Sequence, residues 1–116
     1  IEGSQIDWGG HAGSTIYVVE DMLDFDQVIG QTLKFAAKDK ETLVIITADH
    51  ETGGYAINLG STQDTIIGAF TTIHHTASLI PVFAYGPGAE LFRGIYENTA
   101  IYDKMRMAYG FGKENN

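Results

Sequence analysis

The hydrophobic residues between Val19 and Lys38 recur at steps of three and four. They are Met22, Phe25, Ile29, Leu33 and Ala36. This period is typical of an amphipathic α-helix, and acidic residues near its start lie where the helix dipole favours negative charge. The pattern predicts a helix over residues 19–38 whose apolar stripe lies against a sheet.

Two apolar runs predict β-strands. The run Thr42–Ala48 is rich in apolar and β-branched residues without alternation, which is typical of a buried central strand. Leu79–Tyr85 has a similar character and stops at Gly86-Pro87-Gly88, residues that a strand interior does not tolerate. Because a helix is followed directly by a buried strand, the order of elements predicts α/β layering.

Segments rich in glycine and hydroxyl groups predict loops. We expect Gly9–Gly13 to be a flexible loop and Tyr55–Leu59 to be a short strand. The stretch Gly60–Thr76 is rich in Thr, Gly and Ser and shows no sustained period. Loops of this length usually have a function or are mobile.

The C-terminal residues predict a short closing helix. Asn98 or Thr99 is suited to its N-cap, the helix runs to Ala108, and Gly110 is suited to ending it. We expect Gly112–Asn116 to be a frayed tail.

Composition narrows the possible partners and cofactors. A chain of 116 residues is one domain or part of one. The net charge of −8 argues against a broad nucleic-acid-binding face, because a phosphate backbone would be repelled. No apolar run is long enough to predict a membrane span. Cysteine is absent, which excludes disulfides and thiolate metal ligands.

Asp49 and His50 come at the end of the first predicted strand. Open α/β sheets build their binding sites at the carboxyl ends of strands. Adjacent side chains on a strand point to opposite faces, so these two can converge only if the backbone leaves the pleat, which Gly53 and Gly54 permit. The pair suits a metal ion. For an isolated pair of this kind, a turn-capping aspartate beside an exposed histidine is the alternative.

Further candidate ligands lie near the start of the chain and after the long loop. Asp7 and His11 are four residues apart, which faces both side chains the same way on one helical turn. His74 and His75 follow the long loop. Zinc accepts this mixture of imidazole nitrogen and carboxylate oxygen, whereas magnesium prefers oxygen, so Glu2 suits a harder ion. Taken singly, a pair such as Asp7 and His11 is more often an ordinary surface pair than a ligand pair, and adjacent histidines such as His74 and His75 usually belong to an exposed loop.

Three segments in the same order resemble the C-terminal part of bacterial alkaline phosphatases. They are Ile1–Asp7 with His11, Thr47–Gly54, and His75–Ala77 with Pro81–Ala89. The resemblance extends from the first residue to about Met107. It implies an α/β fold in which residues 1–116 are part of a three-layer α/β/α sandwich with a largely parallel central sheet.

The resemblance also implies a first zinc site. Asp7, His11 and His75 match the three protein ligands of that zinc in the family. His74 is the competing ligand, and its place in the motif favours His75.

A second zinc site and a magnesium site are implied in the same way. Asp49 and His50 match two of the three ligands of the second zinc, and Glu2 matches the carboxylate at the magnesium site. In such enzymes a serine attacks the phosphorus of a phosphate monoester, and the phosphoserine is then hydrolysed. Two metal ions stabilise the attacking and departing oxygens.

The nucleophile of the family has no match in this chain. The four serines, Ser4, Ser14, Ser61 and Ser78, fit no nucleophile motif, and Arg93 and Arg106 are distant in sequence from the candidate ligands. We expect the serine, the third ligand of the second zinc and the arginine that binds phosphate to lie N-terminal to Ile1. The isolated chain is therefore expected to lack hydrolase activity.

Two other functions fit the same residues. One is a phosphodiesterase or phosphomutase of the same superfamily, and the other is a non-catalytic zinc-dependent interaction module. The family resemblance implies a periplasmic or secreted protein. Because strands without neighbours expose unpaired backbone groups, we also expect self-association into a homo-oligomer.

Overall fold

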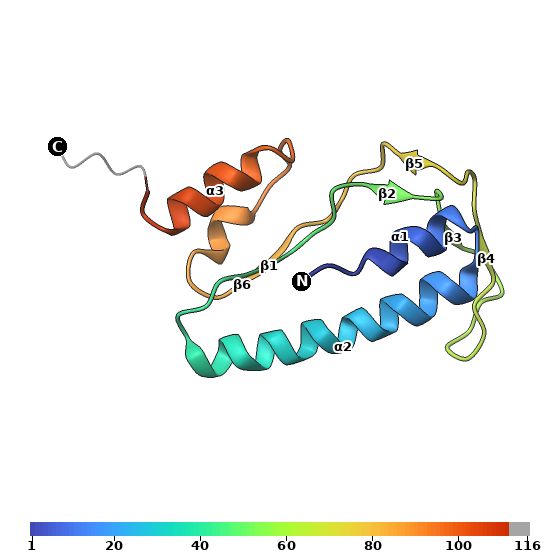
Figure 1. Cartoon of the computed structure of the whole chain (residues 1–116), viewed down its shortest axis with the longest axis horizontal. Helices are drawn as coiled ribbons and strands as arrows, with labels where there is room; N and C mark the ends of the chain where they lie inside the picture. The colour runs from blue at the N-terminus through green and yellow to red at the C-terminus, as the bar shows by residue number, and fades with distance from the viewer. Residues whose placement is uncertain (112–116) are drawn as a thin grey trace. The chain divides into compact units, whose positions relative to one another are not determined.

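The computed structural model describes residues 1–111, so the predicted tail at 112–116 lies outside the described residues. The helices are α1 (Ser4–His11), α2 (Thr15–Asp39), the 3₁₀-helix η1 (Ala89–Phe92) and α3 (Ala100–Ala108) (Figure 1). The strands are short: β1 (Val44–Ile46), β2 (Glu51–Thr52), β3 (Ala56–Ile57), β4 (Gly68–Ala69), β5 (His75–Thr76) and β6 (Phe83–Tyr85).

The chain folds as two compact units. The first contains residues 1–30 and 50–80, and the second contains residues 31–49 and the described residues from 81 to 111. Within the first unit, β2 pairs with β5 and β3 pairs with β4, both antiparallel. Within the second, β1 pairs antiparallel with β6. None of the helices in residues 1–111 combines the length and apolar character that a membrane span requires.

Helix α1 continues through two glycines, so the prediction of a flexible loop from Gly9 to Gly13 is wrong over its first three residues. Gly9 and Gly10 are buried. A Cβ atom on Gly9 would lie 2.9 Å from the backbone nitrogen of Val18, and one on Gly10 would lie 2.8 Å from the backbone oxygen of Thr52. The close packing of α1 on its neighbours therefore outweighs the low helix propensity of glycine.

The predicted amphipathic helix over residues 19–38 is confirmed, and α2 begins four residues earlier. It ends where Lys40 adopts a left-handed conformation with φ of 65° and donates its N–H to the Ala36 carbonyl over 2.8 Å. This is a common way for a helix to terminate. The carboxylate of Asp39 then accepts hydrogen bonds from Glu41 N and Thr42 Oγ1.

Strands β1 and β6 occupy the two predicted apolar runs but are shorter and less buried than expected. Val44 is buried, whereas Phe83 is 61% exposed and Tyr85 is 45% exposed, so the expectation of a buried second strand is wrong. The turn after β6 depends on Gly86, whose φ is 103° and whose Cβ, if present, would strike the Thr42 carbonyl.

The C-terminal elements of the second unit follow the prediction. Helix α3 begins after Thr99, and Gly110, with φ of 74°, follows its end. Lys104 Nζ donates a hydrogen bond to the Leu91 carbonyl over 2.7 Å, which joins α3 to η1. The 3₁₀-helix η1 was not predicted.

The strand pairing differs from the sequence expectation. All three ladders in residues 1–111 are antiparallel, whereas the resemblance implied a largely parallel sheet. The combination of helices and strands agrees with the α/β class.

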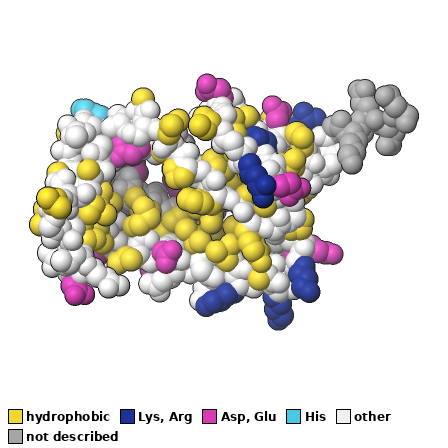
Figure 2. Space-filling view, turned by 180° about the vertical axis from the view of Figure 1, so that it is seen from behind, with side chains coloured by type: hydrophobic (Ala, Val, Ile, Leu, Met, Phe, Trp, Pro, Cys, Tyr) yellow, Lys and Arg dark blue, Asp and Glu magenta, His cyan; other side chains and the backbone are white. Residues whose placement is uncertain are grey.

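Few hydrophobic side chains are buried. Among the described residues these are Ala36, Val44 and Phe92, while large apolar side chains such as Phe35 of α2 and Met107 of α3 are mostly exposed. Figure 2 shows such side chains at the surface of the molecule. Exposed apolar surface marks sites of association, and the expected self-association stays a prediction.

Candidate metal centre

Helix α1 supplies the first two side chains of the centre. Asp7 and His11 are separated by one helical turn, and the distance from His11 Nε2 to Asp7 Oδ1 is 3.5 Å. The predicted orientation of both side chains to one side is confirmed. Both side chains are partly exposed, so an ion or substrate could reach them from solvent.

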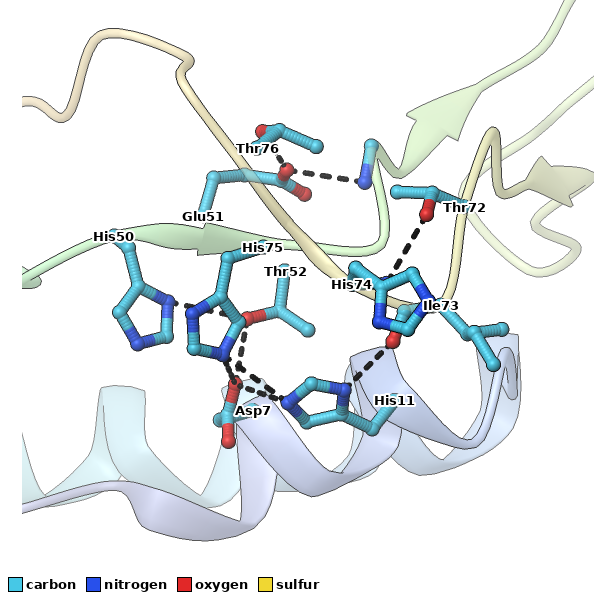
Figure 3. A network of polar contacts seen from close by, with 11 residues as sticks. Asp7, His11, His50, Glu51, Thr52, Thr72, Ile73, His74, His75 and Thr76 are labelled. Atoms are coloured by element: carbon cyan, nitrogen blue, oxygen red, sulfur yellow. Dashed lines mark hydrogen bonds and ion pairs between the residues drawn. The ribbon is translucent and has the colours of Figure 1, made fainter.

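The β2–β5 ladder brings a third side chain from a distant part of the chain. Its register places His75 opposite Thr52. His75 Nε2 lies 3.2 Å from His11 Nε2 and 3.7 Å from Asp7 Oδ1 (Figure 3). Residues that are 64 positions apart in sequence therefore present their ring nitrogens to one another.

His50 is the fourth member of the cluster. It directly precedes β2, and its ring stacks on that of His75 with centroids 3.5 Å apart and planes inclined by 18°. One ligand atom from each of Asp7, His50 and His75 lies within 4.8 Å of the others. We refer to Asp7, His11, His50 and His75 as the histidine cluster.

Two of the predicted ligands are not in the close group. Glu2 is exposed near the start of the chain, and Asp49 belongs to the second unit. Neither is part of a group of mutually close ligand atoms within residues 1–111. His74 is likewise outside the group, and its backbone N–H donates to Thr72 Oγ1 over 3.1 Å.

Gly53 joins the end of β2 to the segment that precedes β5. Its N–H donates to the His74 carbonyl over 3.0 Å, and its own carbonyl accepts from the N–H groups of Thr71 and Thr72. Its φ of 97° and the proximity of Phe70 leave no room for a side chain. The positive φ of Gly53 ends β2 directly after Thr52, whereas the predicted convergence of Asp49 with His50 stays a prediction.

The tautomer of His11 is fixed by the backbone. Its Nδ1 lies 2.7 Å from the Ile73 carbonyl oxygen, and a carbonyl can only accept a hydrogen bond. Nδ1 therefore carries a proton, and in the neutral imidazole the lone pair of Nε2 faces His75 and Asp7. Metal-binding histidines commonly donate their second nitrogen to a carbonyl in this way.

The carboxylate of Asp7 is held in its ionised form. The hydrogen bond from Thr52 Oγ1, at 2.5 Å, lowers the pKa of Asp7 most strongly, partial burial opposes this effect, and His11, His50 and His75 lower it further. Asp7 is therefore negatively charged at neutral pH, as a metal ligand must be.

Glu51 points to the other side of β2 and supports the turn that follows. It accepts hydrogen bonds from Thr76 Oγ1, from Gly54 N at 3.0 Å and from Tyr55 N at 3.2 Å. Burial raises the pKa of Glu51, but these hydrogen bonds, together with His50, outweigh burial and leave the pKa below its ordinary value.

The sequence analysis missed Thr52 as a contact of this centre and Glu51 as the side chain that supports the adjacent turn. The signal was present, because side chains two positions apart in an extended segment share a face. That rule places Thr52 with His50 and places Glu51 on the opposite face.

The donor set of the cluster fits zinc. It offers three imidazole nitrogens and one carboxylate oxygen, which are ordinary zinc ligands, whereas magnesium prefers a shell of oxygen atoms. His11 Nε2 and His75 Nε2 lie 3.2 Å apart, so both rings direct a nitrogen to the same place.

Comparison with known proteins gives a consistent family. The sequence model described as alkaline phosphatase matches residues 1–69. Alkaline phosphatase 4 of Bacillus subtilis (strain 168) is 29% identical over 167 residues, covering 85% of this chain and 36% of that protein.

Solved structures agree with the sequence match. The alkaline phosphatase from the Antarctic bacterium TAB5 is 48% identical with a TM-score of 0.89, covering 97% of this chain and 34% of that one. A variant of the same enzyme with Mg bound in the M3 site is also 48% identical, covers 97% of this chain and 35% of that one, and gives a TM-score of 0.87.

These likenesses confirm the predicted α/β fold class. The chain spans about a third of the length of the relatives it matches. The family model matches more than half of this 116-residue chain, and the chain therefore belongs to the alkaline phosphatase family.

Proposed function

We propose that this chain is the metal-binding portion of an alkaline phosphatase that hydrolyses phosphate monoesters. The observation that carries the proposal is the convergence of Asp7, His11 and His75 from two distant segments. Zinc would be held by these three residues at the first site. The proton on Nδ1 of His11 and the negative charge of Asp7 suit a divalent cation.

The other predicted ligands extend the proposal to two more ions. His50 would contribute to a second zinc together with Asp49, and Glu2 would contribute to a magnesium site. Magnesium is supported by the related structure that holds Mg in its M3 site. When bound, such ions lower the pKa of an attacking hydroxyl and stabilise charge on the oxygens of the phosphoryl group.

The residues of this chain prepare the site in three ways. Asp7 supplies a negative charge, the Ile73 carbonyl keeps the Nε2 lone pair of His11 directed into the cluster, and the β2–β5 ladder positions His75. A protein with net charge −8 must concentrate positive charge locally to attract phosphate, and bound cations do this.

The nucleophile of the proposed reaction is expected outside residues 1–116. None of the four serines belongs to the histidine cluster, and the relatives are about three times as long. We therefore propose that the chain alone does not hydrolyse phosphate esters, and that a phosphoserine forms only in a longer polypeptide. A periplasmic or secreted location and a homo-oligomeric state complete the proposal.

Zinc titration of the purified chain tests the metal site. Structural zinc sites contribute about 10–16 kcal/mol, so loss of one of three ligands should weaken binding by at least about a hundredfold. We expect this for His11→Ala and for His75→Ala, measured by isothermal calorimetry. His74→Ala is the matched control and should retain the affinity of the wild-type chain.

Turnover of p-nitrophenyl phosphate tests the catalytic part. The chain alone should give none, and addition of the N-terminal two-thirds of a related alkaline phosphatase should restore zinc-dependent turnover. Activity of the rigorously purified chain alone would contradict the proposal that the nucleophile lies outside residues 1–116. Zinc binding that is insensitive to both histidine substitutions would contradict the metal site itself.

A further inference from the structure

Thr52 occupies a central position in the histidine cluster although threonine is not a metal ligand there. Its Oγ1 lies 2.5 Å from Asp7 Oδ1 and 3.2 Å from His50 Nδ1 (Figure 3). The residue is partly buried, and in the ladder it stands opposite His75. One hydroxyl group therefore contacts one side chain proposed for the first zinc and one proposed for the second.

The number of protons determines the direction of both hydrogen bonds. A carboxylate at neutral pH can only accept, so the single hydroxyl proton of Thr52 points to Asp7 Oδ1. Only the oxygen lone pairs then remain for His50. His50 Nδ1 must carry a proton in order to donate to that oxygen, so the lone pair of the neutral imidazole is on Nε2.

The methyl group of Thr52 restricts the hydroxyl to this orientation. Gly10 of α1 lies against Thr52, and a Cβ at Gly10 would meet Thr52 Cγ2 at 2.9 Å and Thr52 O at 2.8 Å. A β-branched side chain has few χ1 positions, so a methyl group packed on one side fixes the oxygen on another. The absence of a side chain at Gly10 allows this close approach.

We propose that Thr52 is a positioning residue that sets the Nδ1–H tautomer of His50 and orients Asp7, and so couples the ligand sets of two metal ions through one hydroxyl group. The consequence for metal binding rests on the proposed function. The tautomer assignment rests only on the contacts of Thr52. His11 has an equivalent arrangement in which the Ile73 carbonyl replaces the hydroxyl.

Nitrogen NMR of the metal-free, full 116-residue chain tests the tautomer directly. The ring nitrogens of His50 are observed at a pH at which the imidazole is neutral, in the wild type and in Thr52→Val, Thr52→Ser and Thr71→Val. We expect the Nδ1–H form in the wild type and in Thr71→Val, because the Thr71 hydroxyl contacts the Gly54 carbonyl instead. Thr52→Val should shift His50 towards the Nε2–H form that predominates in free histidine.

Zinc affinity of the same four proteins tests the functional consequence. Loss of a hydrogen bond that orients a ligand typically weakens metal binding about 10–100-fold, and we expect this for Thr52→Val. Thr52→Ser keeps the hydroxyl but loses the methyl, so its affinity should lie between those of wild type and Thr52→Val. If Thr52 had a purely structural role, Thr52→Val would not change the tautomer of His50.

The outcomes separate this inference from the proposed function. An Nε2–H form of His50 in the wild type, or a tautomer unchanged in Thr52→Val, would overturn the role of Thr52 even if zinc binds normally. If the wild-type chain binds no zinc, the proposed function fails, and the tautomer of His50 still decides whether Thr52 acts as described.

Discussion

Replacement of Gly10 by alanine should separate α1 from β2. The added Cβ would lie 2.8 Å from the Thr52 carbonyl oxygen, which is backbone and cannot rotate away. Overpacking of this kind costs about 1–3 kcal/mol, while alanine returns about 1 kcal/mol through its higher helix propensity. The net free energy of unfolding should therefore fall by about 0–2 kcal/mol.

The same substitution should weaken zinc binding more than it weakens the fold. Movement of α1 displaces Asp7 and His11 from His75 and stretches the hydrogen bond from Thr52. Each 1.4 kcal/mol of lost binding energy corresponds to a tenfold change in affinity. We expect a decrease of about tenfold or more in calorimetric titration.

Gly30 provides a matched control for this experiment. It lies inside α2, and a Cβ there would meet nothing within 4 Å. Gly30→Ala should therefore stabilise the chain by about 0.5–1 kcal/mol in urea denaturation without changing zinc affinity. If Gly10→Ala behaves like Gly30→Ala in both measurements, the close packing of α1 against Thr52 is refuted.

Three further predictions concern the pH response, a turn and the bound metal. Because the pKa of Glu51 lies below its ordinary value of 4.5, the ionised carboxylate stabilises the metal-free fold above that value and the contribution is lost as the pH falls through the folded-state pKa. Glu51→Gln should thus be less stable at neutral pH and should lose less stability on acidification, which urea denaturation at several pH values would show. Gly86→Ala should lower the melting temperature measured by circular dichroism, because φ of 103° and contact with the Thr42 carbonyl both oppose a side chain. Zinc at a hundred times its dissociation constant should stabilise the wild-type chain by about 2.7 kcal/mol, and an unchanged melting temperature on addition of zinc would argue against a specific site.

Local periodicity was sufficient to predict α2 and the orientation of the first ligand pair. The steps of three and four that end at Ala36 reflect one helical face, and the four-residue spacing of Asp7 and His11 does so again. These relationships depend only on the geometry of one turn. They could therefore be read without knowledge of the tertiary structure.

The glycines of α1 show where such local reasoning fails. Gly9 and Gly10 have low helix propensity, but both lie in α1. The helix packs so closely on α2 and β2 that these two positions have no room for a side chain. This close approach is a property of the tertiary structure. The exposure of β6 was also missed, because an apolar run predicts a strand but does not determine whether another part of the protein packs on it.

The choice between His74 and His75 also depended on tertiary structure. Adjacent residues in an extended segment face opposite ways, so only one of the two histidines can point towards Asp7. The structure places His75 opposite Thr52, and the hydrogen bond from Gly53 N to the His74 carbonyl continues this pairing. The resemblance to a family anticipated the result, whereas the residue pattern alone left both histidines open.

The small number of buried hydrophobic residues determines how sharply the chain can unfold. The slope of unfolding free energy against urea concentration and the heat-capacity change both scale with the surface exposed in the transition. With Ala36, Val44 and Phe92 as the buried hydrophobic residues among those described, both quantities should be low for a chain of this length. A steep urea transition would instead reveal that the exposed apolar side chains have acquired a cover, either from a second copy or from the remainder of a longer polypeptide.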